Sequence, residues 1–162
     1  MKGLATTKIL IIAAIATAAF FLLKISLPYI TGSVYNIKDI AKVKGTLEKS
    51  FSENQTIILY LKDNSATIKR GEAFGIAFGI KNLGVEGNFS YSVTAKEGDC
   101  QNPEKIVTAG SGSTKLMENS TYFGLIIFEP VKDMSRCTEI FKLRVEKDGI
   151  EYEESILNVT IS

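Results

Sequence analysis

The side chains best suited to chemistry in this sequence are two cysteines, Cys100 and Cys137. Histidine, the commonest general base and metal ligand, is absent. Two cysteines are too few for a four-thiolate zinc site. No serine, cysteine or lysine can be paired with a histidine base, so the usual nucleophilic catalysis has no candidate residues. The sequence therefore predicts a protein that is not an enzyme and that holds no metal or cofactor.

Acidic side chains are the remaining candidates for a metal site. Their spacing matches no loop of alternating oxygen ligands such as the EF-hand. The glycine-rich residues 110–113 lack the lysine and the helix of a phosphate-binding loop. We interpret the acidic residues as a solvated face, and no small-molecule substrate is evident. These residues are Asp99, Asp133, Glu151, Glu153 and Glu154.

The two cysteines fall in two predicted loops, one after a predicted strand and one before another. A pair of this kind, in an otherwise cysteine-free chain with the features of an exported protein, most often forms a disulfide. The sequence therefore predicts a disulfide between Cys100 and Cys137, and the alternative is two unrelated reduced thiols.

Four segments match the N-glycosylation pattern Asn-X-Ser/Thr, and they begin at Asn54, Asn88, Asn119 and Asn158. Asn88 and Asn158 lie on the polar side of alternating segments. The other two lie near the ends of predicted strands. All four could carry glycans without disturbing a core, so the chain is a candidate glycoprotein.

Charge and length exclude one function class and limit the size of the fold. The 162 residues include 19 basic and 18 acidic side chains, for a net charge of +1. Nucleic-acid binding requires a basic field that neutralises phosphates, so we exclude it. With an apolar terminal segment set aside, the remainder suits one compact domain with a single core.

The uncharged apolar residues 9–23 open the chain and predict a membrane anchor within residues 1–30. Lys8 and Lys24 flank this run, and their stems can lie along apolar surface while the ammonium groups reach the headgroups. Residues 4–29 then exceed the roughly 20 residues needed to cross about 30 Å of hydrocarbon. Basic residues are nearly balanced across this span, so the cysteines and sequons are the reason to place the C-terminal domain outside the cell.

Other interpretations of this segment stay open. A cleaved secretory signal would use Ala16-Thr17-Ala18 as its small-residue cleavage site, and a buried soluble helix is a further alternative. Lys2-Gly3-Leu4 ahead of a long apolar helix resembles the class III signal peptide of archaeal type IV pilins and archaellins. In that family a peptidase cuts after the glycine and the helix packs into a filament core. The resemblance implies a pilin-like filament subunit, or an archaellum accessory protein, as the alternative to a plain anchor.

Residues 31–54 predict an amphipathic helix and a linker. Thr31-Gly32-Ser33 breaks the apolar helix after Pro28. Residues 34–49 then show helical spacing of apolar side chains, which Gly45 is expected to interrupt. We interpret this helix as a membrane-proximal spacer, and the alternative is the lower half of a pilin-type helix.

From residue 55 onward the apolar side chains alternate, as they do in strands. Residues 110–113 predict a flexible connection, and Asp148-Gly149 predicts a hairpin turn. About seven short strands without intervening helices indicate an antiparallel, immunoglobulin-like β-sandwich over residues 55–162. The segments with strand patterns are 56–61, 66–69, 73–81, 88–96, 105–109, 122–128, 138–146 and 151–161.

One of these segments has large and small residues on opposite faces. Residues 74–84, Phe-Gly-Ile-Ala-Phe-Gly-Ile-Lys-Asn-Leu-Gly, direct large side chains to one face, and the small face implies close approach of another layer or a thin edge. Together with residues 88–93, Asn-Phe-Ser-Tyr-Ser-Val, this stretch looks like the strand, Asn-X-Gly turn and strand of CARDB-type modules of archaeal and bacterial surface proteins. The resemblance implies adhesion or scaffolding, through a protein partner or self-assembly. The expected protein is a single-pass, membrane-anchored extracellular β-sandwich with a binding or scaffolding role.

Overall fold

A computed structural model describes the backbone of residues 37–162 and the side chains from Lys42 onward. The predicted anchor, the class III processing residues Lys2, Gly3 and Leu4, and the break at residues 31–33 lie outside this part. Among the described residues, no helix has the length and apolar character needed to cross a bilayer.

In residues 37–162, one helix precedes nine strand segments and two 3-10 turns, Lys62–Asn64 and Pro103–Lys105. All eight predicted strand segments correspond to observed strands, with ends that differ by a few residues. The elements are α2 (Ile37–Ser50), β1 (Ile57–Leu59), β2 (Ser65–Ile68), β3 (Phe74–Lys81), β4 (Gly87–Gly98), β5 (Val107–Ala109), β6 (Ser111–Leu116), β7 (Thr121–Phe128), β8 (Cys137–Lys147) and β9 (Ile150–Ile161).

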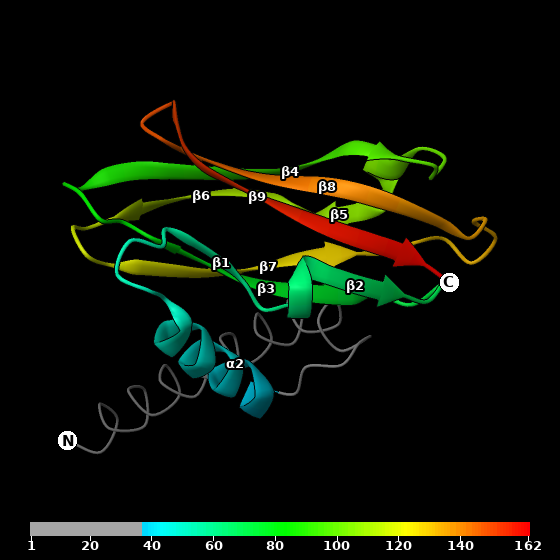
Figure 1. Cartoon of the computed structure of the whole chain (residues 1–162), viewed down its shortest axis with the longest axis horizontal. Coiled ribbons are helices and arrows are strands. Elements are labelled where there is room, and N and C mark those ends of the chain that lie inside the picture. Colours follow the sequence, from blue (N-terminus) through cyan, green and yellow to red (C-terminus); the bar gives the residue numbers. More distant parts are fainter. Residues whose placement is uncertain (1–36) are drawn as a thin grey trace, which may run out of the picture. The chain divides into compact units, whose positions relative to one another are not determined.

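The strands form a two-sheet sandwich (Figure 1). One sheet has the order β1-β3-β7-β5 and the other has the order β2-β9-β8-β4-β6. Because β1 and β2 run the same way, as do β5 and β6, each pair is one pass of the chain that changes sheet partway. The nine segments therefore make seven passes in the immunoglobulin-like arrangement. One pairing, β2 with β9, is parallel, so the prediction of a wholly antiparallel sandwich was wrong there.

Two local predictions were also wrong. Residues 110–113 are not a flexible connection, because the chain changes sheets at Gly110 and continues as β6. Helix α2 also passes Gly45 without interruption. The lone glycine lowers helix propensity by about 1 kcal/mol, and the packing of α2 on the sandwich outweighs that cost.

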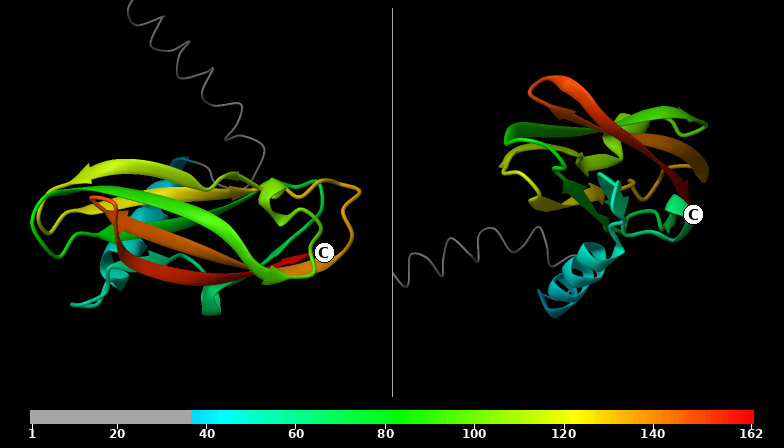
Figure 2. Two further views of the ribbon diagram at one scale, coloured as in Figure 1. Left: turned by 90° about the horizontal axis from the view of Figure 1, so that it is seen from above. Right: turned by 60° about the vertical axis from the view of Figure 1, so that its left-hand side comes forward.

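The core lies between the two sheets, whose layers are visible in Figure 2. Phe78 and Phe128 face the second sheet, where Phe78 packs edge-on against Tyr91 at 4.8 Å and Phe128 against Phe141 at 5.1 Å between ring centroids. The large residues predicted to face inward on β8 and β9 are buried: Phe141, Leu143, Val145, Leu157, Val159 and Ile161. The Asp148-Gly149 hairpin is confirmed, with φ of 51° and 79° at its two turn residues.

Helix α2 packs on the outer face of the first sheet, against β1 and β3 (Figure 1). Among the helix side chains from Lys42 onward, Val43 and Leu47 are buried. The chain just after the helix places the Phe51 ring over Gly79, where a Cβ atom would lie 2.9 Å from that ring. The small outer face of β3 therefore allows the close approach of another layer, as its sequence predicted.

Tyr91 on β4 makes the free energy of unfolding depend on pH in the alkaline range. Burial, with the Tyr122 hydroxyl beside it, raises the pKa of Tyr91 to about 12. Between its usual pKa of about 10 and this value, the unfolded chain releases the phenol proton while the folded chain keeps it. We therefore expect the free energy of unfolding to fall as the pH rises from 10 to 12.

Replacing Tyr91 with Phe should remove that part of the fall, as measured by thermal unfolding from pH 9 to 12. The matched control is Tyr60→Phe, whose side chain is 39% exposed, and it should keep the wild-type profile. Identical profiles for Tyr91→Phe and wild type would show that Tyr91 is not the source.

Candidate binding surface at one end of the sandwich

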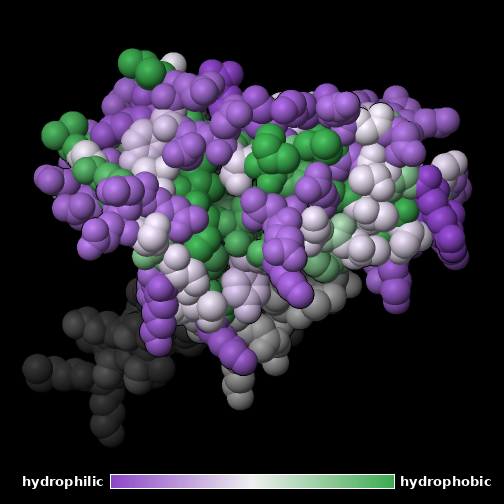
Figure 3. Space-filling model, in the orientation of Figure 1, coloured by the Kyte–Doolittle hydropathy of each residue, from purple (hydrophilic) through white to green (hydrophobic). Residues whose placement is uncertain are grey.

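Three connections meet at one end of the sandwich: β3–β4, β6–β7 and β8–β9. These connections and the first residue of β9 carry four of the six large hydrophobic side chains that are exposed in the described part of the chain. We call these four residues the loop-end surface: Leu83 (38% exposed), Val85 (74%), Met117 (60%) and Ile150 (74%). Figure 3 shows hydrophobic side chains projecting at this end among polar neighbours. Contiguous exposed apolar patches mark interaction surfaces, and these four side chains lie close to one end of the sandwich.

A fully buried asparagine, Asn82, ties these connections together. Its side-chain amide group donates to the carbonyl oxygens of Val85 (2.9 Å), Met117 (3.1 Å) and Leu116 (3.2 Å). Its Oδ1 accepts from the Gly84 N–H at 3.0 Å. The Asn82 backbone N–H also donates to the Ser120 carbonyl. One side chain therefore fixes both the β3–β4 and the β6–β7 connections.

Strands β8 and β9 hold the same loop from the other side. The Tyr152 hydroxyl accepts from the Leu83 N–H at 3.1 Å and donates to the Lys81 carbonyl at 3.0 Å. The Lys147 ammonium donates to the Val85 carbonyl and to Asn82 Oδ1. The loop-end surface is thus presented by a hydrogen-bonded frame, which lowers the conformational entropy lost when a partner binds.

Four charged side chains around the loop-end surface have partners within the chain. Lys115 forms an ion pair with Glu86, and the Lys147 ammonium is bonded to loop oxygens. Asp148 accepts from the backbone and side-chain amides of Asn88 at 2.9 and 3.3 Å. The loop-end surface, with apolar side chains and paired charges, is therefore better suited to binding an apolar protein surface than to binding a highly charged ligand.

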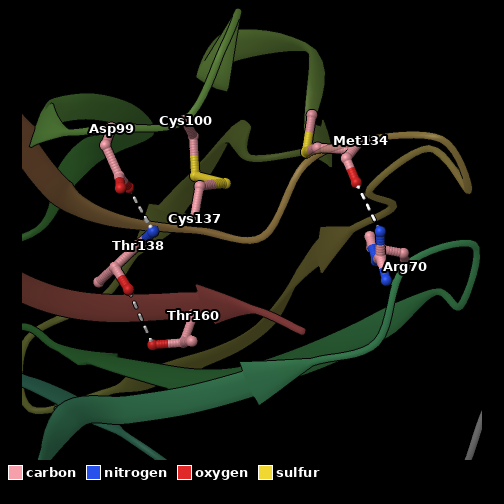
Figure 4. Close-up of a disulfide and its surroundings, with 7 residues drawn as sticks. All are labelled: Arg70, Asp99, Cys100, Met134, Cys137, Thr138 and Thr160. Atoms are coloured by element: carbon pink, nitrogen blue, oxygen red, sulfur yellow. Dashed lines mark hydrogen bonds between the residues drawn. A yellow bond between two sulfur atoms is a disulfide. The ribbon is translucent and has the colours of Figure 1, made fainter.

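Cys100 and Cys137 form a disulfide at the opposite end of the second sheet, between the end of β4 and the start of β8 (Figure 4). Beside it, Asp99 Oδ1 accepts from the Thr138 N–H at 2.6 Å, and the Asp99 N–H donates to the Thr138 carbonyl. Thr138 also shares a hydroxyl hydrogen bond with Thr160 at 3.3 Å. The disulfide and the Asp99 bonds join the end of β4 to β8, and the hydroxyl bond of Thr138 joins β8 to β9.

The acidic residues considered from sequence do not gather into one site. Glu154 and Glu151 pair with Lys142 and Arg144, and Glu153 accepts from Thr56 Oγ1. The Lys142 ammonium lowers the pKa of Glu154. In residues 42–162 the one group with metal-ligand spacing is Asp99, Cys100 and Cys137, and its two sulfur atoms are bonded to each other.

All four sequon asparagines, Asn54, Asn88, Asn119 and Asn158, are exposed. Asn88 and Asn158 lie within β4 and β9, and the Asn88 amide is engaged with Asp148. Asn119 lies in the β6–β7 turn with a φ of 57°. Their modification stays a prediction.

No protein-family model matches the sequence, and no curated protein is significantly similar to it. Among solved structures, the chain is similar to the ASH/PapD-like domain 7 of human CEP192, with 9% identity, a TM-score of 0.42, and coverage of 70% of this chain and 89% of that one. A family 123 glycoside hydrolase from Clostridium perfringens aligns with 9% identity, a TM-score of 0.46, and coverage of 66% and 27%. The apo Calx CBD1 domain aligns with 12% identity, a TM-score of 0.38, and coverage of 66% and 96%. Similarities at these TM-scores carry no information about function.

Proposed function

We propose that this chain is a single-pass membrane protein whose extracellular β-sandwich binds a partner protein through the loop-end surface. The observation that carries the proposal is the frame around Asn82, a fully buried asparagine that fixes exposed apolar side chains on adjoining loops. Stability alone does not require exposed valine, methionine and isoleucine at such positions, whereas preorganised apolar contacts favour association.

Two features support the proposed location of the domain outside the membrane. The uncharged residues 9–23 between two lysines favour an anchor. The disulfide at Cys100 and Cys137 favours an oxidising compartment outside the cytoplasm. The likeness to CARDB-type modules, an archaeal host and glycans on the sequons belong to the same proposal.

The test is site-specific photo-crosslinking in the native membrane. A photoreactive amino acid at Val85 should give one discrete adduct with a partner protein, because that side chain is 74% exposed on the loop-end surface. The matched control position is Thr94, exposed on the outer face of β4 away from these loops. Equal labelling at both positions, or none at Val85, would contradict the proposal.

The N-terminal mass of the same membrane-derived protein tests the anchor. An intact Met1 supports a plain anchor, and a start at Leu4 would instead favour the pilin-like filament subunit. A start near Ala19 would contradict both and leave a secreted domain.

A further inference from the structure

Strand β6 differs from the other strands at the sheet edges. The edges formed by β1, β5 and β2 are three, three and four residues long, and the β5 pairing is irregular. Short and irregular edges are ordinary protection against unwanted strand pairing. Strand β6 has six residues, Ser-Gly-Ser-Thr-Lys-Leu, in unbroken register with β4. Within residues 37–162, no strand pairs with its outer edge.

The hydrogen-bonding direction of each β6 residue follows from one bond and the register. The Val93 N–H donates to the Gly110 carbonyl at 2.7 Å, and the pairing of Ser92 with Ser111 continues from that point. Bonded and non-bonded pairs alternate along an antiparallel ladder. Gly112, Thr114 and Leu116 therefore bond to β4. The other three residues, Ser111, Ser113 and Lys115, direct their N–H and C=O groups to the open edge.

We propose that this edge pairs with β6 of a second copy of the chain, antiparallel and with the two-fold axis at Ser113. In this register, Ser113 faces its own counterpart and Ser111 faces Lys115 of the second copy. All three outward residues of each strand are then paired, which gives six hydrogen bonds and joins two five-stranded sheets.

The charge pattern of β6 selects this register. Lys115 is the one charged residue of the strand. An axis at Lys115 would place two ammonium groups opposite each other, and the Glu86 carboxylate bonded to each of them offsets only part of the repulsion. An axis at Gly112 or Thr114 would pair two of the three outward residues. The small residues Ser111, Gly112 and Ser113 also allow close approach of the second strand.

A six-residue edge contact is smaller than the interface of a permanent dimer, so the association is weak, with a dissociation constant of roughly 0.1 to 1 mM. Cross-linking detects such an equilibrium. The full chain in detergent micelles, with Ser113→Cys and a short thiol-to-thiol reagent, should give a covalent dimer. Thr94→Cys should give little covalent dimer, because Thr94 is exposed on β4, the neighbouring strand, and not at the open edge.

A matched pair of charge variants then tests the register. In the Ser113→Cys background, Ser111→Glu places a carboxylate opposite Lys115 of the second copy, and Ser111→Lys places an ammonium group there. We expect the dimerisation constant to rise roughly fivefold with the first and to fall roughly fivefold with the second. Within one chain, residues 111 and 115 are too far apart along the strand for a direct pair. Equal cross-linking at Ser113 and Thr94, or the same response to both charges, would overturn the proposal, even if a dimer forms through another part of the chain.

Discussion

Replacing Asn82 with Ala should lower the free energy of unfolding by about 3 to 4 kcal/mol. The substitution removes the side-chain hydrogen bonds from Asn82 to Leu116 and Met117, which join the two connections, and the bond to Val85 within the β3–β4 loop. The Leu116 carbonyl loses this partner in a buried position, and the Gly84 N–H and the Lys147 ammonium lose it in partly buried positions. Unpaired buried polar groups cost more than the net value of the bonds that they formed.

Chemical denaturation of the full chain in detergent measures this loss, and amide hydrogen exchange localises it. Exchange should accelerate most at Leu83 and Gly84, whose N–H groups are held by Tyr152 and Asn82. The matched control is Asn88→Ala, since Asn88 is exposed and its side chain makes one long bond to Asp148. It should cost less than about 1 kcal/mol. Similar losses for Asn82 and Asn88 would show that Asn82 does not hold the frame.

The hydrogen bonds of Asn82 should also strengthen binding of the partner, because they hold the loops in one conformation. If Asn82 preorganises the loop-end surface, an Asn82→Ala chain that is still folded should give weaker photo-crosslinking from Val85 than wild type. This variant keeps the Val85 position that makes the contact. Weaker cross-linking would therefore report a loss of order in the loop and not the loss of the contact side chain.

Most of the strand positions were predictable from the sequence because alternation is a local signal. Phe141, Leu143 and Val145 could be placed inward, since one face of β8 is covered by the core. The Asp148-Gly149 turn was equally clear, because two successive positive φ angles suit few other residue pairs. These features depend on neighbours in the chain.

The features that were missed depend on distant neighbours. The segment Gly110–Ser113 has the composition of a linker, and β6 forms there because β4 offers an open edge. Asn82 looked like an ordinary turn residue, since asparagine usually marks exposed turns. Its burial results from Leu116, Met117 and Lys147, which are more than thirty residues away in sequence. The loop-end surface likewise combines three loops that only the topology brings together.

Removing the disulfide should have an effect as large as that of Asn82→Ala. The bond between Cys100 and Cys137 closes a loop with a sequence separation of 37 residues that contains β5, β6 and β7. By the chain-entropy relation, such a cross-link contributes about 4 kcal/mol, chiefly by restricting the unfolded chain. We therefore expect Cys100→Ala with Cys137→Ala to lower the free energy of unfolding by about 3 to 4 kcal/mol and the melting temperature by about 15 °C.

Single substitutions distinguish this mechanism from a loss of packing. Either Cys100→Ala or Cys137→Ala alone breaks the cross-link, so each single variant should be nearly as unstable as the double variant. If each buried cysteine acted only through its own packing, the two losses would instead add. Reductant should bring the wild-type chain close to the double variant and leave the double variant unchanged. The bonds between Asp99 and Thr138 keep β4 and β8 aligned in the native state, so the weakened protein should still fold with the same strand register.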